Sequence, residues 1–203
     1  MTTMRVPRAV TPMVTGERDM VAAEQAAAGF LRALGAELGV NAGQTPGRMA
    51  RAFAELLTPR MFDLTTFPNE ENYNQLVLVR GVPFASVCEH HVLPFVGTAD
   101  VGYLPGERII GLSKLARVVE LFSRRLQVQE RMTQQVTDWI AGNLQPKGVG
   151  VVVRAEHLCM RLRGVQAEGT STVTSALHGL LLDDPRARDE FMALTRTTEG
   201  NRR

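Results

Sequence analysis

Several features are scarce in this chain of 203 residues. It has no run of about 18 consecutive apolar residues, which argues against a membrane-spanning helix. Its formal net charge is only +2, which is too small to indicate nucleic-acid binding by itself. No continuous apolar segment follows the arginines near the N-terminus, so we expect no secretory signal and a cytoplasmic location. Cysteine is also rare, with two residues, and an intracellular chain seldom keeps a disulfide.

The few cysteines and histidines are concentrated in two short segments. Residues 88–91 read Cys-Glu-His-His, and residues 156–159 read Glu-His-Leu-Cys. Together these segments contain both cysteines and three of the four histidines. Thiolate and imidazole are the ligands that zinc prefers, so this concentration favours a metal site assembled from two distant parts of the chain.

Three of these side chains would be enough for a catalytic metal site. If Cys88, His91 and Cys159 bind one zinc ion, a fourth position remains for water, which distinguishes catalytic from structural zinc sites. Zinc lowers the pKa of a bound water towards neutrality and so makes hydroxide available. His90 and His157 would then be left as general acids or bases, because histidine titrates in a suitable range.

Other interpretations of the two segments stay open at this point. The cysteines could form a disulfide or remain inert buried thiols, and the histidines could be hydrogen-bonded core residues. A structural zinc site is a further alternative. It requires a fourth protein ligand, and the one histidine outside the two segments is His178.

The hydrophobic pattern divides the chain into a helical N-terminal part and a mixed remainder. Residues 1–16 show no periodicity and are expected to form a flexible leader. Helical spacing over residues 17–38, and a second helix with Thr45 as its N-cap, define an N-terminal helical region of residues 17–58. Residues 58–75 are polar and are expected to form a loop.

Beyond residue 75 the pattern predicts strands and helices in alternation. The first expected elements are a strand at 75–84 and a hairpin of strands 96–104 and 108–112. Two helices follow, beginning at Ser113 as N-cap and separated near residue 127. The remainder is expected to form a strand at 149–155 continued by 161–165, a strand at 171–180, a helix from Pro185, and a frayed tail at 197–203.

This order predicts an α+β fold with a mainly antiparallel sheet, helices on one face of it, and a helical appendage at the N-terminus. A sheet that is covered on one face leaves its other face or its edges in need of cover. We therefore expect the protein to form an oligomer.

Four motifs follow one another along the chain. Besides residues 88–91, they are Gly-Leu-Ser-Lys-Leu-Ala-Arg at 111–117, Arg-Leu-Gln-Val-Gln-Glu-Arg at 125–131, and His-Leu-Cys-Met at 157–160 with Arg-Gly-Val at 163–165. Together they resemble the GTP cyclohydrolase I family, over most of the chain from residue 45 to residue 194. The resemblance implies the tunnelling (T-) fold for a catalytic domain of residues 75–196. It also implies a homo-oligomer, usually a decamer, with active sites between subunits.

The resemblance also implies a reaction. The three metal ligands named above match the zinc ligands of the family, whose bound water would attack C8 of GTP. His157 matches the proton donor near the imidazole nitrogen of the purine, and His90 matches the second catalytic histidine. The purine ring would then open, formate would leave and the ribose would rearrange. Ser113 matches a residue that serves the ribose steps. The product would be 7,8-dihydroneopterin triphosphate, the first intermediate towards folate.

Substrate contacts are implied at five further positions. Glu130 can accept two hydrogen bonds, which suits the N1–H and exocyclic amine of guanine, and Gln129 matches the neighbouring guanine contact. Lys114, Arg117 and Arg163 match cationic positions for the triphosphate. Lys114 and Arg117 also fall in the first turns of a predicted helix, where free N–H groups favour phosphate. Without the resemblance, these charged residues would be interpreted as a solvated surface.

One residue departs from the family pattern, and one expected phosphate contact has only a candidate. Glu168 places a negative charge where relatives often carry a positive one, which bears on phosphate contacts from its loop. In the N-terminal helices Arg48 is the candidate for a further phosphate contact. The alternatives to a zinc-dependent GTP cyclohydrolase I are a T-fold relative that acts on another purine or pterin, and a non-catalytic zinc-binding scaffold.

Overall fold

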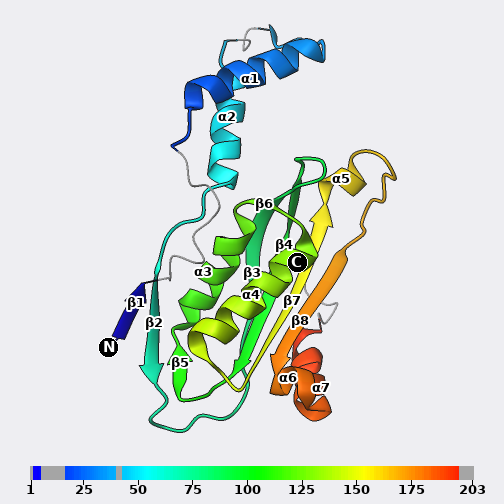
Figure 1. The fold of residues 1–203 in the computed structure, drawn as a ribbon. Coiled ribbons are helices and arrows are strands. Elements are labelled where there is room, and N and C mark those ends of the chain that lie inside the picture. The colour runs from blue at the N-terminus through cyan, green and yellow to red at the C-terminus, as the bar shows by residue number, and fades with distance from the viewer. Residues whose placement is uncertain (1, 6–16, 40–42, 197–203) are drawn as a thin grey trace, which may run out of the picture.

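The computed structural model describes residues 2–5, 17–39 and 43–196. They form an α+β fold with one sheet of five strands and one of three (Figure 1). Two helices near the N-terminus project beyond one end of the larger sheet (Figure 1). None of the helices in the described ranges has the length and apolar character that crossing a membrane requires.

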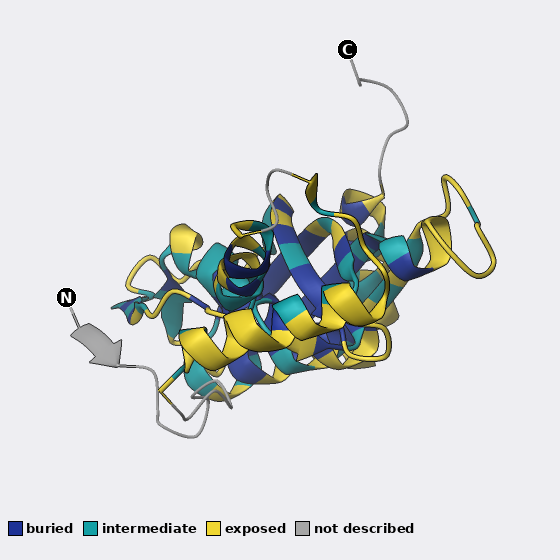
Figure 2. Ribbon diagram, turned by 90° about the horizontal axis from the view of Figure 1, so that it is seen from above, coloured by how far each residue is buried: buried dark blue, intermediate teal, exposed yellow. Residues whose placement is uncertain are grey.

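The N-terminal helices are α1 (Met20–Ala33) and α2 (Thr45–Leu56), which pack against each other. The carboxylate of Asp19 caps α1 by accepting a hydrogen bond from a first-turn amide at 2.8 Å. Most of α1 is exposed (Figure 2). The prediction of Thr45 as N-cap was wrong by one position, because Gln44 occupies the cap and Thr45 begins the helix. Both helices lie within residues 17–58, the predicted helical region.

The larger sheet has the strand order β6-β3-β4-β7-β8. Neighbouring strands are antiparallel, except that β3 and β6 are parallel. Because β3 and β7 both run antiparallel to β4 between them, their C-terminal ends lie at the same edge of the sheet. The strands are β3 (Val77–Cys88), β4 (Pro94–Leu104), β6 (Leu126–Gln127), β7 (Gly148–His157) and β8 (Thr172–Gly179).

Two helices, α3 (Leu112–Ser123) and α4 (Gln129–Leu144), cover one face of this sheet (Figure 1). Their apolar faces and every second residue of β7 form the main core, which confirms the prediction of two helices separated near residue 127. The predicted N-cap was wrong, because Gly111 occupies the cap of α3 and Ser113 lies within the first turn. Fully buried core residues include Leu115, Val118, Val136, Ile140, Val151 and Val153.

A separate three-stranded sheet corrects three expectations. It consists of β1 (Thr2–Arg5), β2 (Asp63–Pro68) and β5 (Arg108–Ile110) in the order β1-β2-β5. Thus part of the expected leader and part of the expected loop are strands, and β5 pairs with β2 rather than forming a hairpin with β4. Alternate residues of β2, Leu64 and Thr66, are buried, which is the period expected for a strand.

The end of the chain covers part of the opposite face of the larger sheet. A short helix α6 (Leu180–Asp183) leads into α7 (Pro185–Thr195), and Phe191 of α7 is fully buried against Gly102 and Gly150. Gly150 alternates with the core residues that face α3 and α4, so Phe191 lies on the other face. The prediction that helices cover only one face of the sheet was therefore wrong, because α7 packs on the other face. The expected tail at 197–203 lies outside the described residues.

The segment after β7 also differs from expectation. A single helical turn, α5 (Leu158–Arg161), follows directly, and a loop takes the place of the strand predicted at 161–165. This turn redirects the chain at the edge of the sheet where β3 also ends, next to the connection between β3 and β4 (Figure 1).

Candidate active site

The sheet topology brings the two cysteine-containing segments together. Cys88 is the last residue of β3, and Cys159 lies in α5 immediately after β7. The strand between them is β4, whose residue Phe95 pairs with His157 at the end of β7. Segments about 70 residues apart in sequence therefore meet at one edge because three strands alternate in direction.

A tight connection from β3 to β4 holds the first segment. The Cys88 amide donates to the Leu93 carbonyl at 2.9 Å, and the Val92 amide donates to the Cys88 carbonyl at 2.8 Å. Val92 has a φ of 55°, an uncommon conformation for a β-branched residue that the surrounding turn must stabilise. The Glu89 amide donates to the Gln127 carbonyl at 3.1 Å, which ties the turn to β6.

Cys88, His91 and Cys159 can offer ligand atoms that all lie within 4.8 Å of one another. Zn–S and Zn–N bonds of about 2.3 and 2.0 Å would place tetrahedral ligand atoms about 3.5–3.8 Å apart, so only a small inward movement is needed to bind an ion. His90 Nδ1 lies 3.8 Å from Cys88 Sγ, but His90 is not one of the three converging residues. His91, whose Nδ1 lies 4.0 Å from Cys88 Sγ, is the histidine that converges with both cysteines.

The donor set also fits a cation in its electrostatics. Both cysteines are buried and free. Burial, together with the nearby Cys88 sulfur, raises the pKa of the Cys159 thiol, while Arg163 opposes this shift. A bound cation would reverse the balance, because a coordinating thiol is deprotonated.

Two alternatives receive no support from this arrangement. The cysteines are close but not bonded to each other. His178 pairs with Val149 near the start of β7, whereas Cys159 follows the end of that strand. At about 3.3 Å per residue, the eight residues from Val149 to His157 span roughly 26 Å, so His178 cannot be a fourth ligand.

His157 is held by contacts on its face and at its edge. Its ring stacks on Phe95 with 4.6 Å between centroids and 4° between planes. Its Nε2 lies 2.8 Å from Oε1 of Gln129. Burial lowers the pKa of His157, and the nearby carboxylate of Glu130 opposes the shift.

The two residues predicted to contact guanine begin α4, but they face different surroundings. Glu130 is exposed and lies near enough to influence His157. Gln129 is 2% exposed, and both polar atoms of its side chain are bonded within the protein. A side-chain contact between Gln129 and a base would require these bonds to break.

The predicted ribose and phosphate residues of α3 lie elsewhere on the chain. Ser113 and Arg117 line a cavity of about 370 Å³ beside residues 82–85 of β3. About five residues separate Pro83 from Cys88 along β3, or roughly 16 Å. Lys114 extends towards the ring of Phe62, with Nζ 6.0 Å from its centroid. One chain therefore does not gather all the predicted substrate residues in one pocket.

An arginine that the sequence analysis did not predict lines the same cavity. Arg60 Nε donates to Glu120 Oε1 at 2.6 Å, and Arg117 Nη1 donates to Glu120 Oε2 at 2.9 Å. Burial would raise the pKa of Glu120, but the hydrogen bonds from the two arginines outweigh it and lower the pKa. No motif connects Arg60 with Glu120, because 60 residues separate them.

The remaining predicted positions are exposed. Arg163 lies in the loop after α5, close enough to affect Cys159. The carboxylate of Glu168 lies 3.6 Å from Arg161, which partly neutralises the charge that departs from the family pattern. Arg48 donates to Gln44 within α2.

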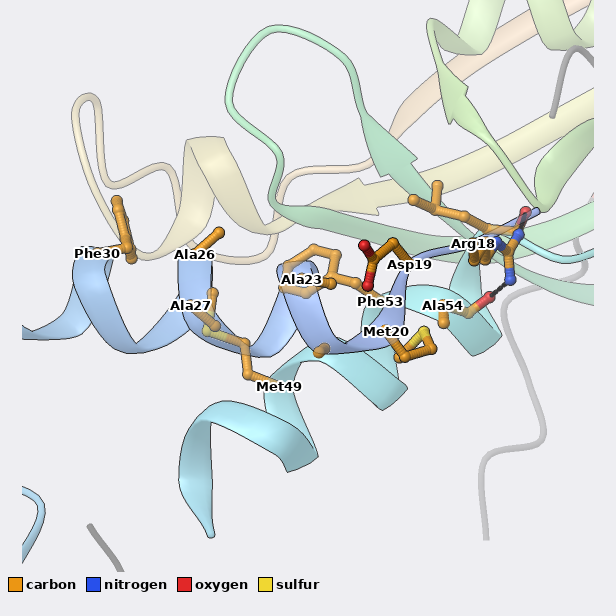
Figure 3. Close-up of a pocket in the computed structure, with 12 residues that line it drawn as sticks. Arg18, Asp19, Met20, Ala23, Ala26, Ala27, Phe30, Met49, Phe53 and Ala54 are labelled. Atoms are coloured by element: carbon orange, nitrogen blue, oxygen red, sulfur yellow. Dashed lines mark hydrogen bonds between the residues drawn. The ribbon is translucent and has the colours of Figure 1, made fainter. Parts of the chain in front are cut away.

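A cavity between α1 and α2 contains none of the predicted site residues. It has a volume of about 480 Å³ and is lined mainly by apolar side chains such as Ala27, Phe30, Met49 and Phe53 (Figure 3). At one end Arg18 donates to the Ala54 carbonyl at 2.8 Å (Figure 3). Its lining is mainly apolar, in contrast to the cysteines and histidines at the edge of the larger sheet.

These features define a class of protein: an α+β chain with three converging Cys–His–Cys residues that could hold a metal ion, flanked by two further histidines. The family model for GTP cyclohydrolase I matches residues 23–196. The chain therefore belongs to the GTP cyclohydrolase I family.

Relatives within this family cover most of the chain. GTP cyclohydrolase 1 of Aquifex aeolicus is 49% identical over 75% of this chain and 83% of its own length. The protein of the same name from a Hydrogenobaculum species is 44% identical over 82% of this chain and 92% of its own length. GTP cyclohydrolase 1 of Rattus norvegicus is 51% identical over 63% of this chain and 53% of its own length. Among solved structures, apo archaeosine synthase QueF-Like is 17% identical with a TM-score of 0.41 over 53% of this chain and 94% of its own, a likeness too weak to support an inference.

Proposed function

We propose that this protein is a zinc-dependent enzyme that converts GTP into 7,8-dihydroneopterin triphosphate with release of formate. The observation that carries the proposal is the convergence of Cys88, His91 and Cys159 at the sheet edge where His157 also lies, in a member of the GTP cyclohydrolase I family. The reaction is the first step towards folate.

The three converging residues would hold the metal. Zinc suits a set of two thiolates and one imidazole better than harder cations do, and three protein ligands leave one position for water or substrate. When bound, zinc would supply Lewis acidity and lower the pKa of water for attack at C8 of the purine.

Neighbouring side chains would bind and protonate the base. Glu130 is placed to accept the N1–H and exocyclic amine of guanine while His157 donates a proton to the imidazole nitrogen of the purine. The carboxylate of Glu130 raises the pKa of His157, so the two side chains lie close together. This supports the two roles, because both side chains would have to contact the same purine. His90, exposed beside Cys88, would serve as the second catalytic histidine.

The ribose and triphosphate would be bound by Ser113, Lys114, Arg117 and Arg163. In one chain Ser113 and Arg117 line a cavity away from the metal site. This separation supports a site shared between subunits of a homo-oligomer, for which we propose a decamer. It is also consistent with the T-fold, which we propose for residues 75–196.

The test is direct. The purified, zinc-loaded protein is incubated with GTP, and formate and the oxidised, fluorescent pterin are measured together with the product mass. We expect equal amounts of formate and 7,8-dihydroneopterin triphosphate, and loss of both after chelation. Activity that survives metal removal, a ring-opened product that retains ribose, or turnover of another purine or pterin in place of GTP would contradict the proposal.

A further inference from the structure

The side chain of Gln129 makes several hydrogen-bond contacts beside the candidate active site. Its amide nitrogen lies 3.2 Å from the Val153 carbonyl and 3.0 Å from the Thr172 carbonyl, which belong to the paired strands β7 and β8. Its amide oxygen lies 2.8 Å from Nε2 of His157. Gln129 thus connects the start of α4 to the sheet and to a histidine beside the metal site.

These contacts fix which way the amide points. Backbone carbonyls only accept hydrogen bonds, so the nitrogen of Gln129 must face Val153 and Thr172. The oxygen then faces His157, and because an amide oxygen only accepts, Nε2 of His157 must carry the hydrogen. The surroundings of Gln129 therefore determine both the amide orientation and the histidine tautomer.

Two threonine hydroxyls close the network around the amide. The hydroxyl of Thr133 donates its single hydrogen to the backbone carbonyl of Gln129 at 2.8 Å. In the 2.7 Å contact between the two hydroxyls Thr174 must therefore be the donor. Thr174 can then accept from the Gln129 amide nitrogen at 3.1 Å, so the two amide hydrogens are shared among three acceptors, the Val153 and Thr172 carbonyls and the Thr174 hydroxyl.

The ring of His157 is restrained in a second direction. The stacking on Phe95 sets the plane of the imidazole, and the bond to Gln129 sets its rotation within that plane. Among the described residues, Nδ1 of His157 has no hydrogen-bond partner. Nδ1 is therefore the ring nitrogen left to meet a substrate.

We propose that Gln129 is a positioning residue that holds His157 with Nε2 bonded to the protein and Nδ1 presented to the purine. This inference rests on the proposed function, which assigns protonation of the purine to His157. Donation from Nδ1 requires the doubly protonated ring, in which Nε2 keeps its hydrogen bond to Gln129. It also changes the expected role of Gln129 itself, which acts through the histidine and leaves side-chain recognition of guanine to Glu130.

The principal test replaces Gln129 with methionine, which has a similar length and forms none of these bonds. We expect kcat to fall about 10–100-fold, by analogy with the loss found when the hydrogen-bonding partner of a metal-binding histidine is removed. KM for GTP and the zinc content should stay near the wild-type values. Gln134→Met is the matched control, since Gln134 is an exposed residue of the same helix that contacts Asp138, and it should leave kcat unchanged.

A double-mutant cycle separates positioning from a general structural effect. In a His157→Ala background the Gln129→Met change should lower the remaining single-turnover rate by no more than about twofold, because its partner is gone. An equal loss in both backgrounds would overturn the proposal. So would a large rise in KM with kcat unchanged, which is the result expected of a direct guanine contact, or full activity of Gln129→Met.

If Gln129→Met does not fold, Gln129→Leu removes the same hydrogen bonds with a smaller side chain. It should lower kcat without changing KM, and only when His157 is present; any other pattern overturns the proposal. Wild-type protein that binds zinc but forms no pterin from GTP would refute the proposed function instead. An active wild type with a folded and fully active Gln129→Met or Gln129→Leu variant would refute this inference alone.

Discussion

Adjacent residues at the start of α4 are directed into opposite environments. Gln129 is almost fully buried in a hydrogen-bonded network, and Glu130 is exposed beside His157. Successive helical side chains point in different directions, so one of two neighbours can face the core while the other faces a ligand. The sequence motif marked both residues as part of a site, but it could not show which of them faces inward.

Replacing Glu130 with glutamine tests recognition of the base. The amide keeps the size of the side chain but offers one acceptor where guanine presents two donors. We expect kcat/KM for GTP to fall about 10–100-fold, which corresponds to a loss of roughly 1–3 kcal/mol for a bidentate contact. Steady-state kinetics would measure the loss.

Asp138→Asn, an exposed change on the same helix, serves as the control for Glu130→Gln and should be neutral. Unchanged kcat/KM in Glu130→Gln would show that this carboxylate does not recognise guanine.

Metal-site residues were predictable from sequence because cysteine and histidine are rare here and occur close together. The supporting residues were not. Arg60, Thr133 and Thr174 acquire their partners only through tertiary contacts, and arginine or threonine in an isolated sequence carries no sign of such a partner.

At the level of elements, the hydrophobic period predicted the presence and order of the long strands and helices, although β3 runs on to Cys88 and α1 ends at Ala33. It failed where burial depends on another part of the chain. β2 is short and contains polar threonines, and its buried positions become visible only once it pairs with β5. The turn after β4 was expected to return as a hairpin, yet β5 turns away to join β2.

The packing of α7 against the sheet makes a stability prediction. A Cβ at Gly150 would lie 2.7 Å from ring atoms of Phe191, which is fully buried. Gly150→Ala should therefore lower the free energy of unfolding by about 1–3 kcal/mol through overpacking. Urea unfolding at fixed protein concentration would measure this change.

Gly142→Ala is the matched control for that prediction. Gly142 lies inside α4, and a Cβ there would meet nothing within 4 Å. Alanine should raise the free energy of unfolding by about 0.5–1 kcal/mol, because glycine is a poor helix former. Equal effects of the two substitutions would contradict the account of how α7 packs.

At the scale of the whole molecule, the alternation of strand direction is what creates the site. β3 and β7 end at one edge because β4 runs between them in the opposite sense. The hydrophobic pattern predicts a mainly antiparallel sheet but not its strand order, so only ligand chemistry indicated that the two segments meet. The hydrophobic pattern could not place Ser113 and Arg117 relative to the metal site, because their position depends on how α3 lies along β3. Only the family resemblance, which implies active sites between subunits, pointed to such a separation.

Zinc content and GTP turnover, measured together on wild type, Cys159→Ala and His157→Ala, test the central claim most directly. Wild type should bind one zinc per subunit, and Cys159→Ala should lose both metal and turnover because a three-ligand site cannot lose a ligand without losing the ion. His157→Ala should keep its zinc while kcat falls about 10²–10⁴-fold, as expected for a missing general acid. Full zinc and full turnover in Cys159→Ala would contradict the account.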